Sequence, residues 1–456
     1  MEVPNELLIS LMTEAGASNK GLAKRMRDLA HQRGAVLGTT HVSVKRWSAG
    51  AGIQPQTAAI LRDVLSDQLG RRLTLADLGL LCDPEPQAGP AHGYPASAQE
   101  ALAALDALAG TDPNTMVTGP VNATDNGLDS AVLTWMLARP DGVPAAEASA
   151  RRVGMRDVHA IRTAGGMFMR LDFLYGGGHG HRALRHYFRH EVLPMLAGNH
   201  RERVGTALFS AATEIAQLLA WTAYDSGKHA LAHRYLISTL RLTQVTGDRM
   251  AGARILSNLS HQANYLGHHP QALRLARAAV EGARHHATPR AMSLYTAMEA
   301  RALGRGSDAV GAARAMNEAE RHFERADTGN DPGWLAYFDA AELQGELAHC
   351  FRDLKQHHKA VRHAQGAVTG TDPQYARTLG FCRMVLAQSL LLHGELEAAL
   401  ATATVAVDEG DSLQSTRFLG YVTGFQQEVD VHAGHPRVAV FHDRVREALA
   451  RMDEED

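Results

Sequence analysis

Hydrogen-bonding and cationic side chains gather within residues 39–50, a segment that the sequence predicts to be a short helix. Thr40 is a favourable N-cap and Gly50 a favourable helix end. Val44 and Trp47 lie three residues apart and can face inward together on such a helix. The side chains left outside offer hydrogen-bond donors, a methyl surface and two positive charges, which suit base edges and phosphates. A solvated amphipathic helix with a basic end is the alternative interpretation.

The charge of the flanking residues favours a polyanionic partner. Residues 1–80 carry ten Lys and Arg against seven Asp and Glu, whereas the rest of the chain carries 36 against 42. Between residues 18 and 47 seven cations face only Asp28, a local balance of +6. The candidate nucleic-acid contacts are Ser18, Asn19, Lys20, Lys24, Arg25, Arg27, Thr40, His41, Val42, Ser43, Lys45 and Arg46.

Caps and apolar spacing predict the helices that must position these residues. Asn5 and Ser18 can cap two helices that precede residue 33, and Pro55 can open a fourth helix after the one that follows Thr40. The first turn after Ser18 exposes Asn19 and Lys20, a favourable place for a phosphate. We therefore expect a helical unit of about eighty residues.

Residues 18–23, followed by residues 43–47 and Gly50, resemble the helix-turn-helix of phage-repressor-type regulators. In that family the second of these two helices enters the major groove of DNA. The connection departs from the family pattern, because residues 27–38 stand where the family has a tight turn. Either the first of the two helices is extended or the loop is enlarged.

From residue 151 onward, breaks interrupt apolar helical runs at intervals that suggest repeats. The breaks stand at Gly227, Gly267, Gly304, Lys355, Gly394 and Gly434. Small residues, suited to the close crossing of two helices in a hairpin, follow these breaks at Ala232, Ala272, Ala279, Ala309, Ala360, Ala367, Ala399, Ala406 and Ala439. The arrangement resembles tetratricopeptide repeats, although the spacing is longer than usual, and favours a solenoid of helical hairpins.

The predicted fold is all-α, because aromatic residues are scarce and alanine is abundant. We expect a helix-turn-helix domain in residues 1–81 and a partly ordered linker with short helices in residues 82–150. A tetratricopeptide-like helical repeat domain then fills residues 151–456. Within the linker, residues 98–108 and 128–138 are the expected helices.

The combination of these parts resembles actinomycete regulators that repress differentiation and antibiotic production, and more loosely peptide-sensing regulators of Gram-positive bacteria. Motifs at residues 151–154, 174–179, 221–225 and 348–353 are similar to those of the first group. The resemblance implies a transcription regulator of repressor type that binds an operator with an inverted repeat as a homodimer. A scaffold that binds a protein or peptide through the array, without binding DNA, is the alternative.

Residues on the inner face of the array are candidates for binding a small-molecule or peptide effector. They are Tyr224, Arg352 and Asp353, for which structural hydrogen bonding between hairpins is the alternative role. His179, His181, His186 and His190 lie close together, but no carboxylate or cysteine pattern completes a metal site. The sequence contains no phosphate-binding glycine loop, nucleophile elbow or zinc-protease helix. We expect no catalytic activity, metal or cofactor.

Cysteine usage and the N-terminal residues favour a cytoplasmic protein. Cys82, Cys350 and Cys382 are too widely spaced to suggest a disulfide framework or a zinc ribbon. Glu2 and Glu6 stand where a signal peptide would carry positive charge, and no apolar run is long enough to span a membrane. We therefore expect no membrane partner.

Overall fold

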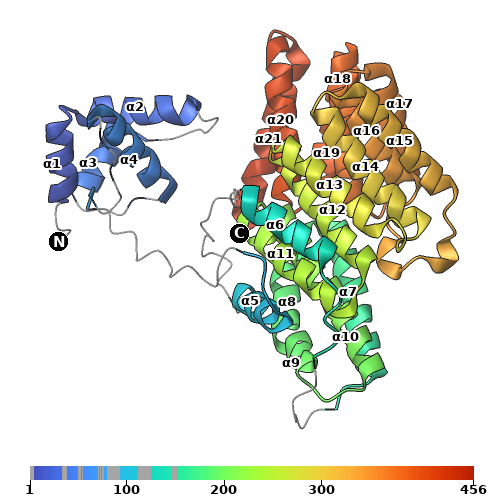
Figure 1. Cartoon of the computed structure of the whole chain (residues 1–456). Helices are drawn as coiled ribbons and strands as arrows, with labels where there is room; N and C mark the ends of the chain where they lie inside the picture. Colours follow the sequence, from blue (N-terminus) through green and yellow to red (C-terminus); the bar gives the residue numbers. More distant parts are fainter. Residues whose placement is uncertain are drawn as a thin grey trace. The chain divides into compact units, whose positions relative to one another are not determined.

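The computed structural model describes residues 5–32, 39–49, 53, 55–69, 71, 73, 77–79, 93–110, 125–144 and 152–455. The chain divides into two compact units, Met1–Ala91 and His92–Asp456 (Figure 1). The residues so described contain helices and no β-strand, and Arg152 and Asn199 form an isolated bridge. The prediction of an all-α fold is confirmed.

The described residues of the first unit form four helices, and the predicted caps begin three of them. The helices are α1 (Glu6–Glu14), α2 (Asn19–Gln32), α3 (His41–Ser48) and α4 (Pro55–Leu69). The side chain of Asn5 accepts a hydrogen bond from the Leu8 amide at the start of α1. Ser18 accepts one from the Gly21 amide, and Thr40 forms a capping box with Ser43. These contacts satisfy amides that a helix cannot pair internally.

The core of the first unit fixes α3 by its apolar residues. Val44 and Trp47 are buried, as predicted, together with Leu22 and Met26 of α2. Helix α3 is thereby held against α2. The helix before the connection is extended, since α2 continues to Gln32. Residues 33–38 and Gly50 lie outside the described residues.

The second unit is a succession of helices from α5 onward. Its first part contains α5 (Ala98–Gly110), α6 (Asp125–Leu137), α7 (Met155–Tyr175), α8 (Gly177–Tyr187), the π-helix η1 (Phe188–Val192) and α9 (Leu193–Leu196). The hairpins that follow contain α10 (Glu202–Asp225), α11 (His229–Thr246), α12 (Arg249–Tyr265), α13 (His269–Ala283), α14 (Pro289–Arg305), α15 (Ala309–Glu324), α16 (Ala340–Asp353), α17 (His357–Gly370), α18 (Ala376–His393), α19 (Leu396–Glu409), α20 (Thr416–Val429) and α21 (Pro436–Glu455). Short 3-10 helices are η2 (Thr328–Asn330), η3 (Gly333–Leu335) and η4 (Asp430–His432).

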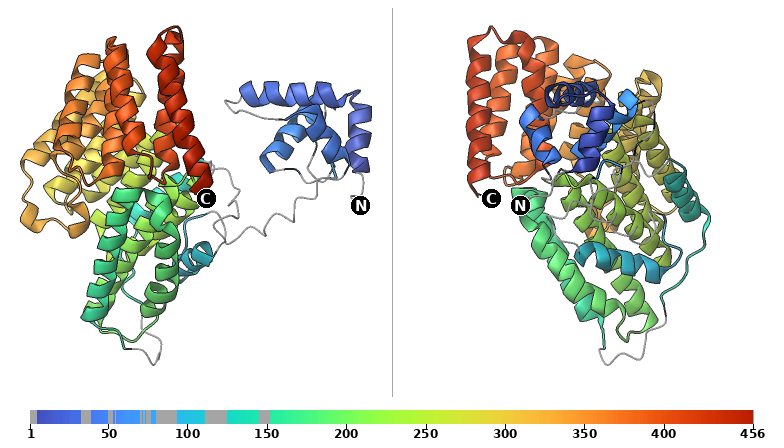
Figure 2. Two further views of the ribbon diagram at one scale, coloured as in Figure 1. Left: turned by 180° about the vertical axis from the view of Figure 1, so that it is seen from behind. Right: turned by 90° about the vertical axis from the view of Figure 1, so that its left-hand side faces the viewer.

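Consecutive helices from α10 to α21 pack as hairpin pairs, which Figure 2 shows side by side. Gly227, Gly267 and Gly394 lie between the two helices of a pair with positive φ, and Lys355 does the same without being a glycine. The predicted break at Gly304 is misplaced, because this residue is still in α14 and the positive φ falls at Ser307. The sequence thus predicted a repeat array, which the structure bears out.

Seven of the nine alanines predicted at helix crossings are buried. These residues are Ala232, Ala272, Ala279, Ala360, Ala367, Ala399 and Ala406. Ala309 and Ala439 are exposed instead. Ala312 stands five residues after Ser307 and is fully buried. This hairpin therefore has a buried alanine at the expected distance from its actual turn.

Two helices of the segment assigned to a linker, α5 and α6, pack against the array within the second unit. The indole nitrogen of Trp135 in α6 donates to the Thr243 hydroxyl at 2.9 Å, and the side chain is buried. Arg249 donates to the Trp135 carbonyl oxygen at 2.7 Å. The segment from 82 to 150 therefore contributes two docked helices to the second unit.

The array curves until distant helices meet. Helix α7 packs against α18, and α10 packs against α20. Arg377 of α18 contacts Asp172 of α7 across 205 positions of sequence, with 2.7 Å between Nη2 and Oδ2. The first helices of successive hairpins line the interior of this ring.

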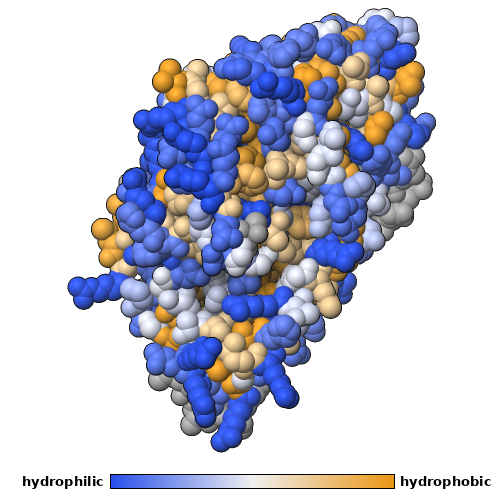
Figure 3. Space-filling model, turned by 90° about the vertical axis from the view of Figure 1, so that its right-hand side faces the viewer, coloured by the Kyte–Doolittle hydropathy of each residue, from blue (hydrophilic) through white to orange (hydrophobic). Residues whose placement is uncertain are grey.

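The outer surface of the second unit is largely polar where it can be seen. On the face drawn in Figure 3, hydrophilic residues predominate and hydrophobic residues are scattered among them. Among the described helices, none is long and apolar enough to cross a membrane.

Candidate nucleic-acid interface and array interior

Helix α3 presents its polar face outward because its apolar residues are fixed in the core. His41, Lys45 and Arg46 are exposed, and Val42 is about half exposed (51%). Thr40 and Ser43 are occupied at the N-terminus of the helix, where they bond to each other's backbone amides. The arrangement leaves an imidazole, a methyl surface and two cations on one short helix, a set that can contact base edges and phosphates.

Helix α2 adds further exposed cations. Lys20, Lys24 and Arg25 are exposed and make no ion pair with any residue that the structure describes. Ser18 is used as the cap of this helix, and Asn19 is half-buried beside it. The amides of a helix N-terminus and a nearby lysine together favour an anion.

Arg27 has a positioning contact in addition to its exposed charge. Its Nη1 donates to the Thr39 carbonyl oxygen at 2.5 Å, just before α3 begins. The contact links α2 to the start of α3 across the extended connection. The candidate contacts predicted from the sequence therefore lie on two packed helices, with Arg27 bonded to the segment between them.

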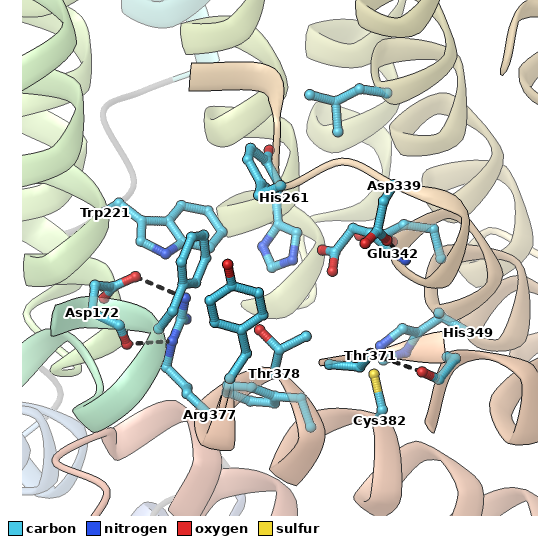
Figure 4. Close-up of a pocket in the computed structure, with 18 of the residues that line it drawn as sticks. Asp172, Trp221, His261, Asp339, Glu342, His349, Thr371, Arg377, Thr378 and Cys382 are labelled. Atoms are coloured by element: carbon cyan, nitrogen blue, oxygen red, sulfur yellow. Dashed lines mark hydrogen bonds and ion pairs between the residues drawn. The ribbon is translucent and has the colours of Figure 1, made fainter. Parts of the chain in front are cut away.

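The interior of the second unit contains a cavity of about 420 Å³. Figure 4 shows its lining, to which α7, α10, α12, α14, α16, α18 and α20 contribute. Four buried arginines line it: Arg254, Arg301, Arg377 and Arg417. Aromatic residues complete much of the remaining wall: Phe173, Trp221, Tyr337, Tyr375, Phe381 and Tyr421. A volume in this range is typical of small-molecule pockets.

Asp225 is the electrostatic centre beside the cavity. It is fully buried, accepts a hydrogen bond from the Gly177 amide at 2.9 Å, and lies 3.4 Å from both Arg377 and Arg417. Gly177 is required there, since a Cβ at this position would lie 2.7 Å from the Thr222 carbonyl oxygen. Two predicted motifs, at residues 174–179 and 221–225, thus meet at one carboxylate.

Burial and neighbouring charges alter the ionisation of cavity residues. Burial, with Glu346 and Asp339 nearby, raises the pKa of Glu342 to about 8, so this carboxyl is largely protonated at neutral pH. Burial and three arginines lower the pKa of His261 well below its usual value. Arg301 donates to Nε2 of this neutral imidazole, so Nδ1 carries the hydrogen and donates to the Tyr224 oxygen.

The three ligand candidates from the sequence lie beside this cavity but outside its lining. Tyr224 is buried and bonds to His261 at 3.0 Å. Arg352 and Asp353 pair with each other at 2.8 Å, and Arg305 also contacts Asp353. The contacts described for these three residues include hydrogen bonds or ion pairs to neighbouring helices, as expected of a structural role.

The cavity residues that sequence reasoning missed stand close to the ones it chose. Trp221 precedes Tyr224 by three positions in α10, and His349 precedes Arg352 by three in α16. The motifs at residues 221–225 and 348–353 were therefore useful signals. No sequence pattern indicated Arg254 or Arg417, because their common location depends on how the hairpins stack.

The histidine cluster near residue 180 is divided between the core and the surface. His181 is buried and its Nδ1 lies 2.8 Å from the Thr222 hydroxyl, whereas His186 and His190 pack ring against ring. No group of three or more His, Cys, Asp or Glu among the described residues could hold a metal ion. Cys350 and Cys382 are buried free thiols, and Cys82 lies outside the described residues.

Comparison with protein families identifies the first unit. Residues 8–81 match the SP15 N-terminal domain, a segment that contains most of α1 and all of α2, α3 and α4. The comparisons with curated proteins and with solved structures found no match. The chain therefore has an SP15 N-terminal domain followed by an all-helical array of paired helices.

Proposed function

We propose that the protein is a DNA-binding transcription regulator whose first unit contacts duplex DNA through α2 and α3. The observation that carries the proposal is the division of α3 between two faces. Val44 and Trp47 anchor it in the core, while Lys45 and Arg46 are exposed and make no ion pair with a described residue. A helix held rigidly by one face and cationic on the other suits the major groove.

The two helices divide the expected contacts. Lys20, Lys24 and Arg25 of α2 supply phosphate affinity that does not depend on base sequence. His41, Ser43, Lys45 and Arg46 of α3 are the residues proposed to contact bases or adjacent phosphates. Arg27 adds charge while it holds the entry to α3.

The proposed biological role is that of a repressor of development or secondary metabolism, in line with the resemblance to actinomycete regulators. A homodimer bound to an inverted repeat is part of the proposal, because operator symmetry mirrors protein symmetry in helix-turn-helix regulators. The array supplies dimerisation and effector sensing.

Genome-wide DNA capture with the full chain tests this proposal. The wild type is compared with the double variant Lys45→Ala/Arg46→Ala. The matched control is Arg71→Ala, which removes an exposed arginine of the same unit that pairs with Glu14 at 2.8 Å. All three proteins are first checked for equal helical content by circular dichroism.

We expect sharp capture peaks that share an inverted repeat in the wild type and in Arg71→Ala, and their loss in the double variant. Uniform capture without peaks from the folded wild type would overturn the proposal. Peaks that persist unchanged in the double variant would remove α3 from the DNA contact.

A further inference from the structure

The cavity of the second unit combines buried cations with an aromatic wall. Arg377 is fully engaged, since it donates to the carbonyl oxygen and carboxylate of Asp172 and lies near Asp225. Arg301 pairs with Glu346 at 2.9 Å. Burying ions is costly unless an opposite charge lies close, and these contacts meet that requirement for two of the four arginines.

Arg254 lacks such a partner. It is 8% exposed, lines the cavity, and makes no hydrogen bond or ion pair with any of the residues that are described. Its guanidinium carbon lies 4.2 Å from the centre of the Trp334 ring, a cation–π contact that pairs none of its N–H donors with an acceptor. The Glu214 carboxylate interacts electrostatically with Arg254 without an ion-pair contact. Glu214 itself lies 3.6 Å from Arg162.

Arg417 is surrounded by rings. Its guanidinium carbon lies 4.7 Å from the ring centres of Tyr224 and Phe381 and 5.2 Å from that of Trp221. Its nearest carboxylate oxygen, on Asp225, is 3.4 Å from Nη1 and is also shared with Arg377. The side of the cavity near Arg417 therefore offers flat apolar surface under positive charge.

The acidic residues of the lining do not neutralise all of the positive charge of the cavity arginines. Asp172 and Glu346 are committed to Arg377 and Arg301, and Glu342 is mainly neutral at pH 7 because of its raised pKa. Asp339 and Asp372 are exposed at the outer part of the lining. The interior thus holds more guanidinium groups than ionised carboxylates that bond to them.

The geometry points to a binding site for a small organic anion, a carboxylate on an aromatic ring system, inside the array. Arg254 binds the carboxylate and the ring system lies against Trp221, Phe381 and Tyr421. Charge-assisted hydrogen bonds from an arginine to a carboxylate are strong and directional, and desolvation within the cavity strengthens them. The cavity volume of about 420 Å³ favours a small molecule over an extended peptide.

Binding of this anion does not depend on the proposed function, although its role as an effector of DNA binding does. The test is therefore made without DNA. Thermal unfolding of the full chain is measured with phenylacetate, 2-naphthylacetate and 9-anthraceneacetate, each against its primary amide. The amides keep the ring systems and remove the charge, so any difference within a pair reports recognition of the anion.

We expect at least one acid to raise the unfolding temperature of the wild type by roughly 2 °C or more beyond its amide at saturating concentration. Arg254→Gln should abolish this difference, and Arg446→Gln, which removes an exposed arginine in α21, should keep it. Thr378→Trp fills the cavity without removing a charge and should abolish binding of acid and amide alike.

Equal shifts for every acid and its amide in the wild type would overturn the inference, as would a full acid preference in folded Arg254→Gln or folded Thr378→Trp. Because no DNA is present, either result leaves the DNA-binding proposal as it stands. Loss of capture peaks in the DNA experiment, conversely, does not affect the ligand measurement.

Discussion

In the first unit Lys24, Arg25 and Arg46 are exposed and make no ion pair with a described residue, whereas in the second unit Arg377 and Arg417 are buried and clustered around Asp225. Positively charged side chains thus stand in two opposite environments. An exposed cation is stabilised by water and remains available to a partner. Arg377 and Arg417 are paired within the fold, so removal of either one leaves a carboxylate with one buried partner fewer.

The comparison shows where function and stability are expected to separate. Charges of α2 and α3 should govern binding to a polyanion with little effect on folding. The paired charges around Asp225 should govern folding first and ligand binding second. A substitution in α2 or α3 that mainly weakened folding would contradict this distinction. A substitution near Asp225 that left folding unchanged would contradict it equally.

The largest effect is expected from Asp225→Ala. The change leaves Arg377 and Arg417 buried without their shared carboxylate and removes the acceptor of the Gly177 amide. We expect a loss of about 3–5 kcal/mol in the free energy of unfolding of the second unit. Urea denaturation followed by tryptophan fluorescence measures it, since Trp221 lies beside this cluster.

Asp443→Ala is the matched control, because its partner Arg446 is mostly exposed and the pair lies on α21. It should change stability by no more than about 0.5 kcal/mol. Equal losses in the two variants would contradict the idea that burial distinguishes the charges of the array.

A smaller, pH-dependent effect is expected from Glu342→Gln. The groups that act on Glu342 are Glu346 and Asp339, which raise its pKa together with burial, and Arg377 and Arg301, which lower it. The folded protein holds this proton more tightly than the unfolded chain, whose carboxyl has a pKa of about 4.5. Stability from the protonated form is therefore lost as pH rises from about 4.5 through 8.

The variant mimics the protonated carboxyl and does not lose this contribution. Its unfolding temperature should match that of the wild type at pH 5 and exceed it at pH 9. Differential scanning calorimetry at the two values measures the change. A constant difference at both pH values would show that the carboxyl does not titrate in this range in the folded protein.

The smallest effect on folding is expected from Arg46→Ala. This side chain is exposed on α3, so its removal should change the free energy of unfolding by less than about 0.5 kcal/mol. The same denaturation experiment measures it. A larger loss would place Arg46 among the residues that hold the first unit together and would weaken the contrast between the two units.

The sequence predicted features that depend on local spacing. Val44 and Trp47 were placed in the core of the first unit because their spacing selects one helical face, and Thr40 was correctly assigned as a cap. The turn at Ser307 was missed because a serine with positive φ has no recognisable sequence signal. The turn was assigned instead to Gly304, three positions earlier, because glycine is the usual residue at the end of a helix.

The interior site depends on contacts that no local pattern encodes. Asp172 and Arg377 meet because α7 and α18 are brought together when the ring of hairpins closes. The motif at residues 221–225 indicated the correct helix, but Tyr224 was chosen and Trp221 lines the cavity. Residues three apart share one face of a helix, so the sequence does not separate Trp221 from Tyr224, and only the packed array decides which of the two lines the cavity.

The dependence of DNA affinity on salt concentration tests the central claim most directly. Fluorescence anisotropy with a duplex recovered by capture gives the slope of log affinity against log salt for the wild type and for Lys45→Ala/Arg46→Ala. If both cations contact phosphates, the wild type should show a steep slope and the double variant one that is smaller by about two. Identical slopes, or a wild-type affinity that does not fall with salt, would contradict a DNA-binding role for the exposed cations of α3.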